Sequence, residues 1–266
     1  MTVSFFELAN MTRGQRDQLL KRTEADLSSY EDKVKPIIAA VRAEGDEALA
    51  RFARQFDKSP VEANAIAATE ADFTRAEKTL APDVRDALAF MAVSIRKFHE
   101  DQKPEEMWFH EIRPGVFAGD RTTAIPSVAC YIPRGKGAFP SSVLMQSIPA
   151  KVAGVKDICI ITPPGPDGHI DDATLVAARM AGVSKVFKAG GAQGIAAVAY
   201  GTETVPKCTK VVGPGSPYVG AAKRLVSHLI DVGTPAGPSE LIVLADDTAD
   251  GRLAGVRCHP AHGLRR

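Results

Sequence analysis

Apolar residues in the first hundred positions recur at the spacing of amphipathic helices. From Tyr30 to Phe56 they follow this spacing, and Gly45 interrupts the series. Because glycine weakens a helix interior, the pattern predicts two helices that meet at Gly45. A second series starts after Pro82 and sets one apolar face against a charged one; its apolar members are Val84, Leu88, Met91, Ile95 and Phe98. The region before Lys103 is therefore predicted to be mainly helical.

The pattern changes after Lys103-Pro104. Apolar and polar residues alternate over residues 107–118, and Arg113-Pro114-Gly115 lies where a turn would reverse the chain. Alternation on both sides of a Pro-Gly turn is typical of a β-hairpin. We therefore expect a two-stranded antiparallel hairpin between the helical region and the rest of the chain.

Short apolar segments alternate with helical segments from Ser127 onward. The predicted strands cover residues 127–132, 157–162, 185–188 and 210–212. The predicted helices that follow them begin at Pro140, near Asp172, at Gln193 and at Ser216. Strands that alternate with helices of this length form a parallel sheet wound by right-handed crossovers. The predicted fold class is α/β.

One further apolar segment, residues 241–245, predicts a strand that is covered on both faces. We expect it to belong with the N-terminal helices rather than with the parallel sheet. The predicted architecture is thus a Rossmann-like parallel-sheet domain inserted in a helix-rich α/β domain. Residues 127–236 form the inserted domain, residues 1–126 the first part of the outer domain, and residues 237–266 its second part.

Composition and charge narrow the class of partner. The 266 residues are 45% hydrophobic and 24% charged, which is typical of a globular protein with one large or two modest domains. The net charge of +1 supplies no basic surface of the kind that nucleic-acid binding requires. No apolar run approaches the ~20 residues of a membrane helix, and the N-terminus lacks the features of a signal peptide. We expect a cytoplasmic protein with neither nucleic acid nor membrane as a partner.

The cysteines and histidines offer little metal chemistry by spacing alone. The cysteines, at positions 130, 159, 208 and 258, form no CxxC pair, so buried structural thiols are the favoured interpretation. Among the histidines only His259 and His262 are close together, and Pro260 between them prevents a regular helix. A surface tail is therefore a better interpretation of these two histidines than a metal site.

Three glycine-bearing turns follow predicted strands, at residues 131–137, 190–193 and 213–217. In an open parallel sheet, ligands bind at the carboxyl ends of the strands, so these turns predict a ligand cleft at one edge. None of them matches G-x-G-x-x-G, and each glycine is also explained by backbone geometry alone. Tyr131 fits a ligand contact or, slightly better, a core aromatic with its hydroxyl at the surface. Gln193 fits either a ligand contact or an exposed first-turn residue.

These turns also carry a family resemblance. Long stretches of the chain resemble histidinol dehydrogenases in order from about Val34 to Ala254: residues 130–135, 140–145, 148–155, 190–193, 199–207, 212–215, 222–224 and 236–240. The resemblance implies an NAD- and zinc-dependent enzyme of histidine biosynthesis, in the form of a homodimer. Such an enzyme oxidises the amino alcohol L-histidinol to L-histidine through the aldehyde, with two hydride transfers to NAD and a zinc ion that holds the substrate.

The resemblance also assigns residues. Tyr131 and Gln193 match family positions that contact NAD, and Ser239 matches a position that contacts the substrate. At the third NAD position the family commonly has Asn, whereas this chain has Ser216, whose hydroxyl replaces only one amide hydrogen bond. Arg134 stands where the family often has a second glycine, and it adds a cation near the nucleotide phosphates.

The end of the chain departs from the family pattern. After a helix near Ala249, the family continues into the zinc ligands and a catalytic Glu-His pair, whereas here Val256 is followed by residues 257–266, in which His262 is the only weak metal candidate. We interpret this tail as truncated or altered, which leaves the zinc site incomplete and the catalytic residues beyond the C-terminus. The chain as written is then expected to bind NAD weakly or not at all and to oxidise no histidinol. Two alternatives are a related dehydrogenase of another small polar alcohol and an inactive remnant.

Overall fold

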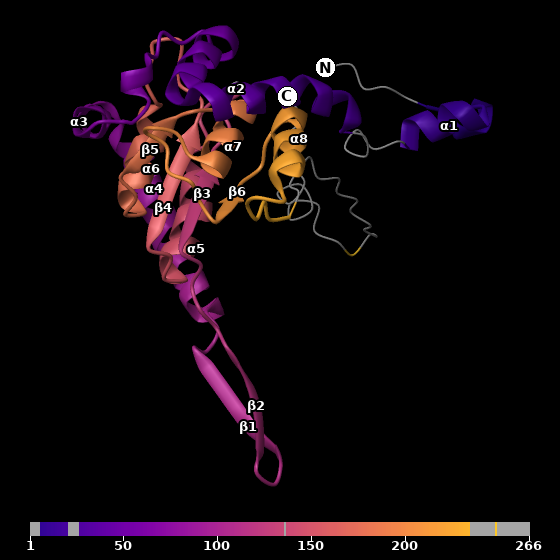
Figure 1. The fold of residues 1–266 in the computed structure, drawn as a ribbon, viewed down its shortest axis with the longest axis vertical. Coiled ribbons are helices and arrows are strands. Elements are labelled where there is room, and N and C mark those ends of the chain that lie inside the picture. The colour runs from indigo at the N-terminus through magenta and orange to yellow at the C-terminus, as the bar shows by residue number, and fades with distance from the viewer. Residues whose placement is uncertain (1–5, 21–26, 136, 235–247, 249–266) are drawn as a thin grey trace.

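The computed structural model describes residues 6–20, 27–135, 137–234 and 248. Its centre is a parallel sheet of four strands in the order β5-β4-β3-β6 (Figure 1). These strands are β3 (Ser127–Tyr131), β4 (Asp157–Thr162), β5 (Lys185–Lys188) and β6 (Lys210–Val212). They alternate with helices α5 (Pro140–Val152), α6 (Asp172–Met180), α7 (Gly191–Tyr200) and α8 (Pro217–Val226). The predicted α/β class and the four predicted strand-helix units are confirmed.

Alternate residues of each strand belong to two different hydrophobic cores. On β3, Ala129 and Tyr131 join the core formed with α2, α7 and α8, whereas Val128 and Cys130 join the core formed with α3, α4, α5 and α6. Successive side chains of a strand point to opposite faces, so a sheet covered on both sides needs apolar residues at nearly every position. This requirement explains the continuous apolar runs in the sequence.

Helix α2 (Ser28–Phe52) bends sharply at Gly45, whose φ of 55° and ψ of −128° are not helical. The second half of the helix starts at the bend, where the backbone N–H of Asp46 donates to Glu203 Oε2 at 2.8 Å. The predicted break at Gly45 is therefore confirmed, and a distant side chain stabilises it. A single π-helical turn, η2 (Ala53–Asp57), follows α2 directly.

Helices α3 and α4 cover the core that Val128 and Cys130 join. Helix α4 (Pro82–Gln102) was predicted, and it packs against α5 and α6. Helix α3 (Glu70–Thr79) was not predicted, although Thr69 and Asp72 form a capping box that marks its start. The other short elements are η1 (Leu8–Asn10), α1 (Arg13–Leu20) and η3 (Ala63–Ala65). None of the helices among the described residues has the length and apolar character needed to cross a bilayer.

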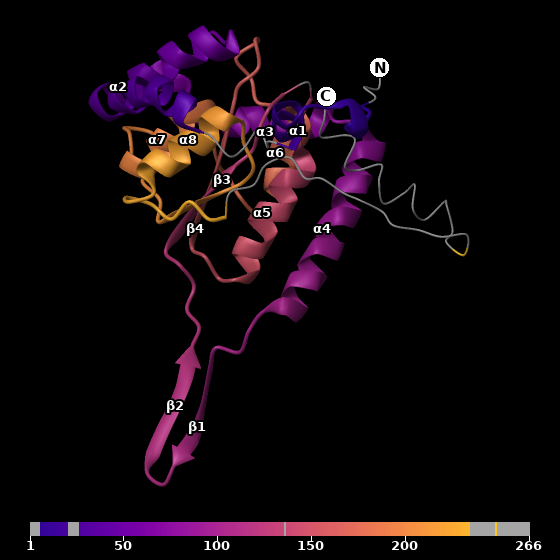
Figure 2. The same cartoon turned by 90° about the vertical axis from the view of Figure 1, so that its right-hand side faces the viewer.

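A β-hairpin arm projects away from this body (Figure 2). Its strands β1 (Met107–Arg113) and β2 (Val116–Arg121) pair antiparallel around Pro114 and Gly115, as predicted. Every residue of both strands is exposed, including Trp108, Phe109 and Phe117.

The predicted division into an inserted and an outer domain stays a prediction. Helices α2, α3 and α4 pack directly on the helices that flank the sheet and share its two hydrophobic cores. The predicted strand at residues 241–245 and the tail at 257–266 lie outside the described residues.

Candidate functional site

The carboxyl edge of the sheet brings together the three residues that were predicted to contact a nucleotide. Tyr131 ends β3, Gln193 lies in the first turn of α7 after β5, and Ser216 is the N-cap residue of α8 after β6. Because all four strands run parallel, these positions share one edge. Their predicted convergence is confirmed, while their role in binding stays a prediction.

A cavity of about 340 Å³ opens at this edge. Its walls come from α2, the π turn, the start of α7 and the start of α8: Ile37, Phe56, Asp57, Gly191, Ala192, Gln193, Ser216 and Tyr218. It combines apolar walls with a few convergent polar groups, the usual character of a small-ligand site. A larger groove of about 1080 Å³ lies near the amino ends of β3 and β6, between α4 and α5. We favour the smaller cavity because parallel sheets bind ligands at their carboxyl edge.

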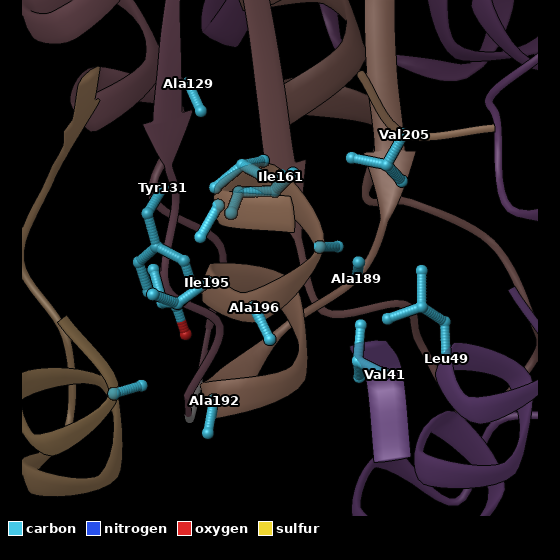
Figure 3. Close-up of a cluster of buried hydrophobic side chains, with 14 of the residues drawn as sticks. Val41, Leu49, Ala129, Tyr131, Ile161, Ala189, Ala192, Ile195, Ala196 and Val205 are labelled. Atoms are coloured by element: carbon cyan, nitrogen blue, oxygen red, sulfur yellow. The ribbon is translucent and has the colours of Figure 1, made fainter. Parts of the chain in front are cut away.

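Tyr131 contacts Gly191, one of the residues that line the cavity. Its side chain is 4% exposed and packs in the core beside Ile195, with its hydroxyl directed toward the start of α7 (Figure 3). The backbone N–H of Gly191 donates to this hydroxyl at 3.2 Å. Burial raises the pKa of Tyr131 to about 12, so the phenol stays protonated near neutral pH. Tyr131 is therefore a core aromatic, as slightly favoured, but its hydroxyl is bonded to Gly191 inside the protein and does not lie at the surface.

Gln193 lies in the first turn of α7, next to Gly191, whose backbone N–H donates to Tyr131. It is 4% exposed, so the alternative of an exposed first-turn residue is wrong. Gly191 has a φ of 55°, and a Cβ atom added there would lie 2.7 Å from Gln193 Oε1. The left-handed φ favours glycine at this position, and the Gln193 amide lies directly beside it.

Ser216 also lines this cavity. Serine at the N-cap of a helix commonly accepts a hydrogen bond from the helix backbone, yet the Ser216 side chain makes no such bond in α8. Its hydroxyl lines the cavity instead, where it can donate one hydrogen bond to a ligand and accept others.

The Gly213 turn that leads to Ser216 is held by a buried lysine, which the sequence analysis missed. Lys223 Nζ donates to the Gly213 carbonyl oxygen at 2.6 Å. Burial lowers the pKa of Lys223 to about 8. Gly213 itself has a φ of 113°, and an added Cβ atom would lie 2.2 Å from the Tyr131 carbonyl oxygen. The turn is therefore fixed closely against the end of β3.

Asp57 is the second residue that the sequence analysis missed. It ends the π turn, and its Oδ2 atom is buried with no hydrogen-bond partner among the described residues. Burial raises the pKa of Asp57 to about 6, and the nearby Arg134 guanidinium partly opposes this shift. Arg134 itself donates to the Pro164 carbonyl oxygen at 2.9 Å, which ties the loop after β3 to the loop after β4.

Comparison with known proteins identifies the family. The model of the family described as histidinol dehydrogenase matches residues 20–256. The chain belongs to the histidinol dehydrogenase family. It is 57% identical over 255 residues to a histidinol dehydrogenase homolog of Rhizobium meliloti (strain 1021), covering 96% of this chain and 56% of the relative. It is 48% identical over 250 residues to the histidinol dehydrogenase of Synechocystis sp. (strain ATCC 27184 / PCC 6803 / Kazusa), covering 94% of this chain and 58% of the relative.

A solved structure supports the same assignment. The crystal structure of histidinol dehydrogenase from Elizabethkingia anophelis superposes with a TM-score of 0.85 at 32% sequence identity, covering 95% of this chain and 58% of that one. The chain therefore spans little more than half the length of these histidinol dehydrogenases.

Two predicted site residues of the histidinol dehydrogenase resemblance cannot be placed. Ser239, the predicted substrate contact, and His262, the weak metal candidate, lie outside the described residues, as does Cys258. The described residues hold no group of three or more His, Cys, Asp or Glu side chains that could bind a metal ion. Cys130, Cys159 and Cys208 are buried free thiols, which confirms their interpretation as buried thiols.

Proposed function

We propose that this chain forms the NAD-binding part of a histidinol dehydrogenase that oxidises L-histidinol to L-histidine through the aldehyde. The observation that carries the proposal is the cavity at the carboxyl edge of the sheet, where Gln193, Ser216 and Asp57 line a space next to two glycine turns. Family membership supports the reaction type. The full oxidation consumes one water and two NAD, and it releases two NADH and three protons.

The residues at this edge fit a dinucleotide. NAD, when bound, accepts hydride from the alcohol and then from the aldehyde hydrate. Gln193 and Ser216 offer side-chain donors and acceptors beside the first turns of α7 and α8, whose amino ends favour negative charge. The Tyr131 hydroxyl accepts a hydrogen bond from the Gly191 backbone, and the Arg134 guanidinium supplies a positive charge near Asp57.

Zinc belongs to the proposed chemistry by resemblance, but the described residues do not fit it. They include no cluster of potential ligands, and a catalytic zinc needs about three protein ligands. We therefore derive no step through the metal. A zinc site that includes His262 would be built from residues outside the described ones.

We further propose a homodimer, as the resemblance implied, and the arm supports it. An isolated two-stranded hairpin is only marginally stable in water. This arm exposes Phe109, Ile112 and Phe117 by 60% or more, so a second copy of the chain would remove apolar surface from water. A cytoplasmic location stays a prediction.

A second candidate function is the oxidation of another small polar alcohol. Two features favour it: Ser216 replaces the common family Asn, and Arg134 replaces a glycine. In addition, highly similar relatives, from Rhizobium meliloti (strain 1021) and Colwellia psychrerythraea (strain 34H / ATCC BAA-681), are named only as histidinol dehydrogenase homologs.

Two measurements test the proposals. NAD binding to the purified 266-residue chain is measured by calorimetry, with Gln193→Ala expected to weaken it at least tenfold because a buried amide partner is lost.

Turnover is measured in a chimera that carries this chain in place of the matching segment of the Rhizobium meliloti relative, with zinc, NAD and a panel of alcohols. If histidinol is the only alcohol of the panel that yields NADH, the first function is supported. If another alcohol is preferred, the second is supported. Absence of NAD binding by both proteins contradicts both functions and leaves the inactive remnant.

A further inference from the structure

One oxygen of the Asp57 carboxylate is buried without a hydrogen-bond partner among the described residues. Oδ2 is inaccessible to solvent and accepts no hydrogen bond from any described residue. A buried polar atom left unpaired costs about 1 to 3 kcal/mol, and more when it is charged. The nearby Arg134 directs its Nη1 to the Pro164 carbonyl oxygen. Because Asp57 also lines the cavity, a turn of its carboxylate about the Cβ–Cγ bond would let a ligand there supply the missing hydrogen bond.

The backbone that carries Asp57 is also unusual. Ala53–Asp57 form a π-helical turn at the end of α2, and Lys58 beyond it has a φ of 57°. Single π turns are rare and occur frequently at functional sites, because they redirect the side chains that follow. This turn places Phe56 and Asp57 together on the wall of the cavity.

The chemistry of the two side chains selects part of a dinucleotide. A carboxylate accepts hydrogen bonds and repels phosphate, so it matches hydroxyl or amino groups rather than the pyrophosphate. A vicinal diol supplies two donors for one carboxylate. Phe56 is 47% exposed at the cavity and stacks on Phe52 with ring centroids 5.4 Å apart, which offers an aromatic face for a base. Base and diol together describe an adenosine.

We propose that Asp57 accepts hydrogen bonds from the adenosine ribose hydroxyls of NAD and thereby excludes a cofactor with a 2′-phosphate. The inference rests on the proposed NAD site. It assigns cofactor specificity to a residue on the π turn rather than to the glycine turns of the sheet edge.

The test compares NAD and NADP binding by the 266-residue chain and two variants. Asp57→Asn keeps the size of the side chain and removes its negative charge. Asp167→Asn is the matched control, because Asp167 also lies near Arg134 but its carboxylate accepts from the His169 backbone N–H and does not line the cavity. We expect Asp57→Asn to weaken NAD binding by about tenfold and to reduce the preference for NAD over NADP by a similar factor. Asp167→Asn should leave both quantities unchanged.

Each outcome decides the assignment. An unchanged NAD-to-NADP ratio in Asp57→Asn overturns it, provided that the wild-type chain binds NAD. A third cofactor, nicotinamide hypoxanthine dinucleotide, lacks the adenine amino group. If Asp57→Asn weakens NAD binding but not binding of this analogue, Asp57 contacts the base and the ribose assignment is wrong. Absence of NAD binding by both the wild-type chain and the chimera contradicts the proposed function itself, and the assignment with it.

Discussion

The body of the protein contains the parallel sheet of β3, β4, β5 and β6, and the arm consists of β1 and β2. Both are β-sheets, yet they differ in what covers them. In the body, β3 is buried from Val128 to Tyr131 because helices pack on both faces of the sheet. In the arm, β1 and β2 have no buried residue, although Phe109 and Phe117 are as apolar as anything in the core. The difference shows that apolar alternation fixes local conformation without fixing the partner. Among the described residues, helices cover the strands of the body, and nothing covers those of the arm.

The largest expected effect tests this contrast in stability. Ile161→Ala removes a fully buried side chain of β4 and should cost about 2 to 5 kcal/mol of unfolding free energy, because it leaves a cavity in the core. Phe109→Ala removes an exposed side chain of the arm and should cost less than about 0.5 kcal/mol in the monomer. Urea unfolding followed by circular dichroism measures both values. Equal costs would mean that the arm is part of the folded core.

The next effect concerns association. The double variant Phe109→Ser with Phe117→Ser removes the paired rings of the arm, whose centroids lie 6.2 Å apart. We expect it to weaken self-association by at least about tenfold, since each buried aromatic side chain contributes about 1.5 to 3 kcal/mol. Leu229→Ser, an exposed apolar position on the body, is the control. Sedimentation analysis measures the dimer constant, and an unchanged constant in the double variant contradicts a dimer contact through the arm.

The body was more predictable from sequence than the site within it. Strand and helix periods are local, so the four strand-helix units and the break at Gly45 were found from the sequence. Asp57 gave no local signal, because its burial depends on the cavity between α2, α7 and α8. The same holds for Lys223, which is buried beneath a turn that is fixed against β3.

Two other differences have particular causes. The exposed alternative for Gln193 was wrong because the left-handed Gly191 allows the side chain to fold over its own turn. Helix α3 was missed because its apolar residues are few, although the capping box of Thr69 and Asp72 was readable. The roles of Tyr131, Gln193 and Ser216 in binding NAD stay predictions that only ligand measurements test.

The body, unlike the arm, contains a buried lysine, Lys223. Burial of its charge lowers the free energy of unfolding, whereas burial of apolar side chains raises it. The folded-state pKa of Lys223, about 8, lies below the ordinary 10.5, so the charged form destabilises the fold below pH 8. Lys223→Met removes that cost but also the hydrogen bond to Gly213. We expect a gain of about 1 kcal/mol at pH 7 that shrinks as the pH rises from 8 to 10. NAD affinity should fall, because the Gly213 turn is less well held.

Urea unfolding at pH 7 and pH 10 measures the stability change, with Lys207→Met, an exposed lysine, as the control. A Lys223→Met variant that is less stable at pH 7 would show that the hydrogen bond outweighs the desolvation of the ammonium group. Unchanged NAD affinity would show that Lys223 has no part in positioning the turn.

The smallest expected effect is a pH dependence that belongs to the cavity and not to the arm. The folded-state pKa of Asp57, about 6, lies above the ordinary 3.8 because of burial, so the neutral acid favours folding. Asp57 therefore contributes stability below about pH 4, and this contribution is lost as the pH rises toward 6.

A ligand that donates hydrogen bonds favours the charged carboxylate, so NAD affinity should increase several-fold between pH 5 and pH 7. The charged and titratable groups that face Asp57 are Arg134 and Tyr131, and Tyr131, whose pKa burial raises to about 12, stays neutral in this range. Calorimetric titration at pH 5, 6 and 7 should show the increase in the wild-type chain and a flat profile in Asp57→Asn, while Phe109→Ala on the arm should follow the wild type. A parallel increase in all three proteins would assign the pH dependence to a group other than Asp57.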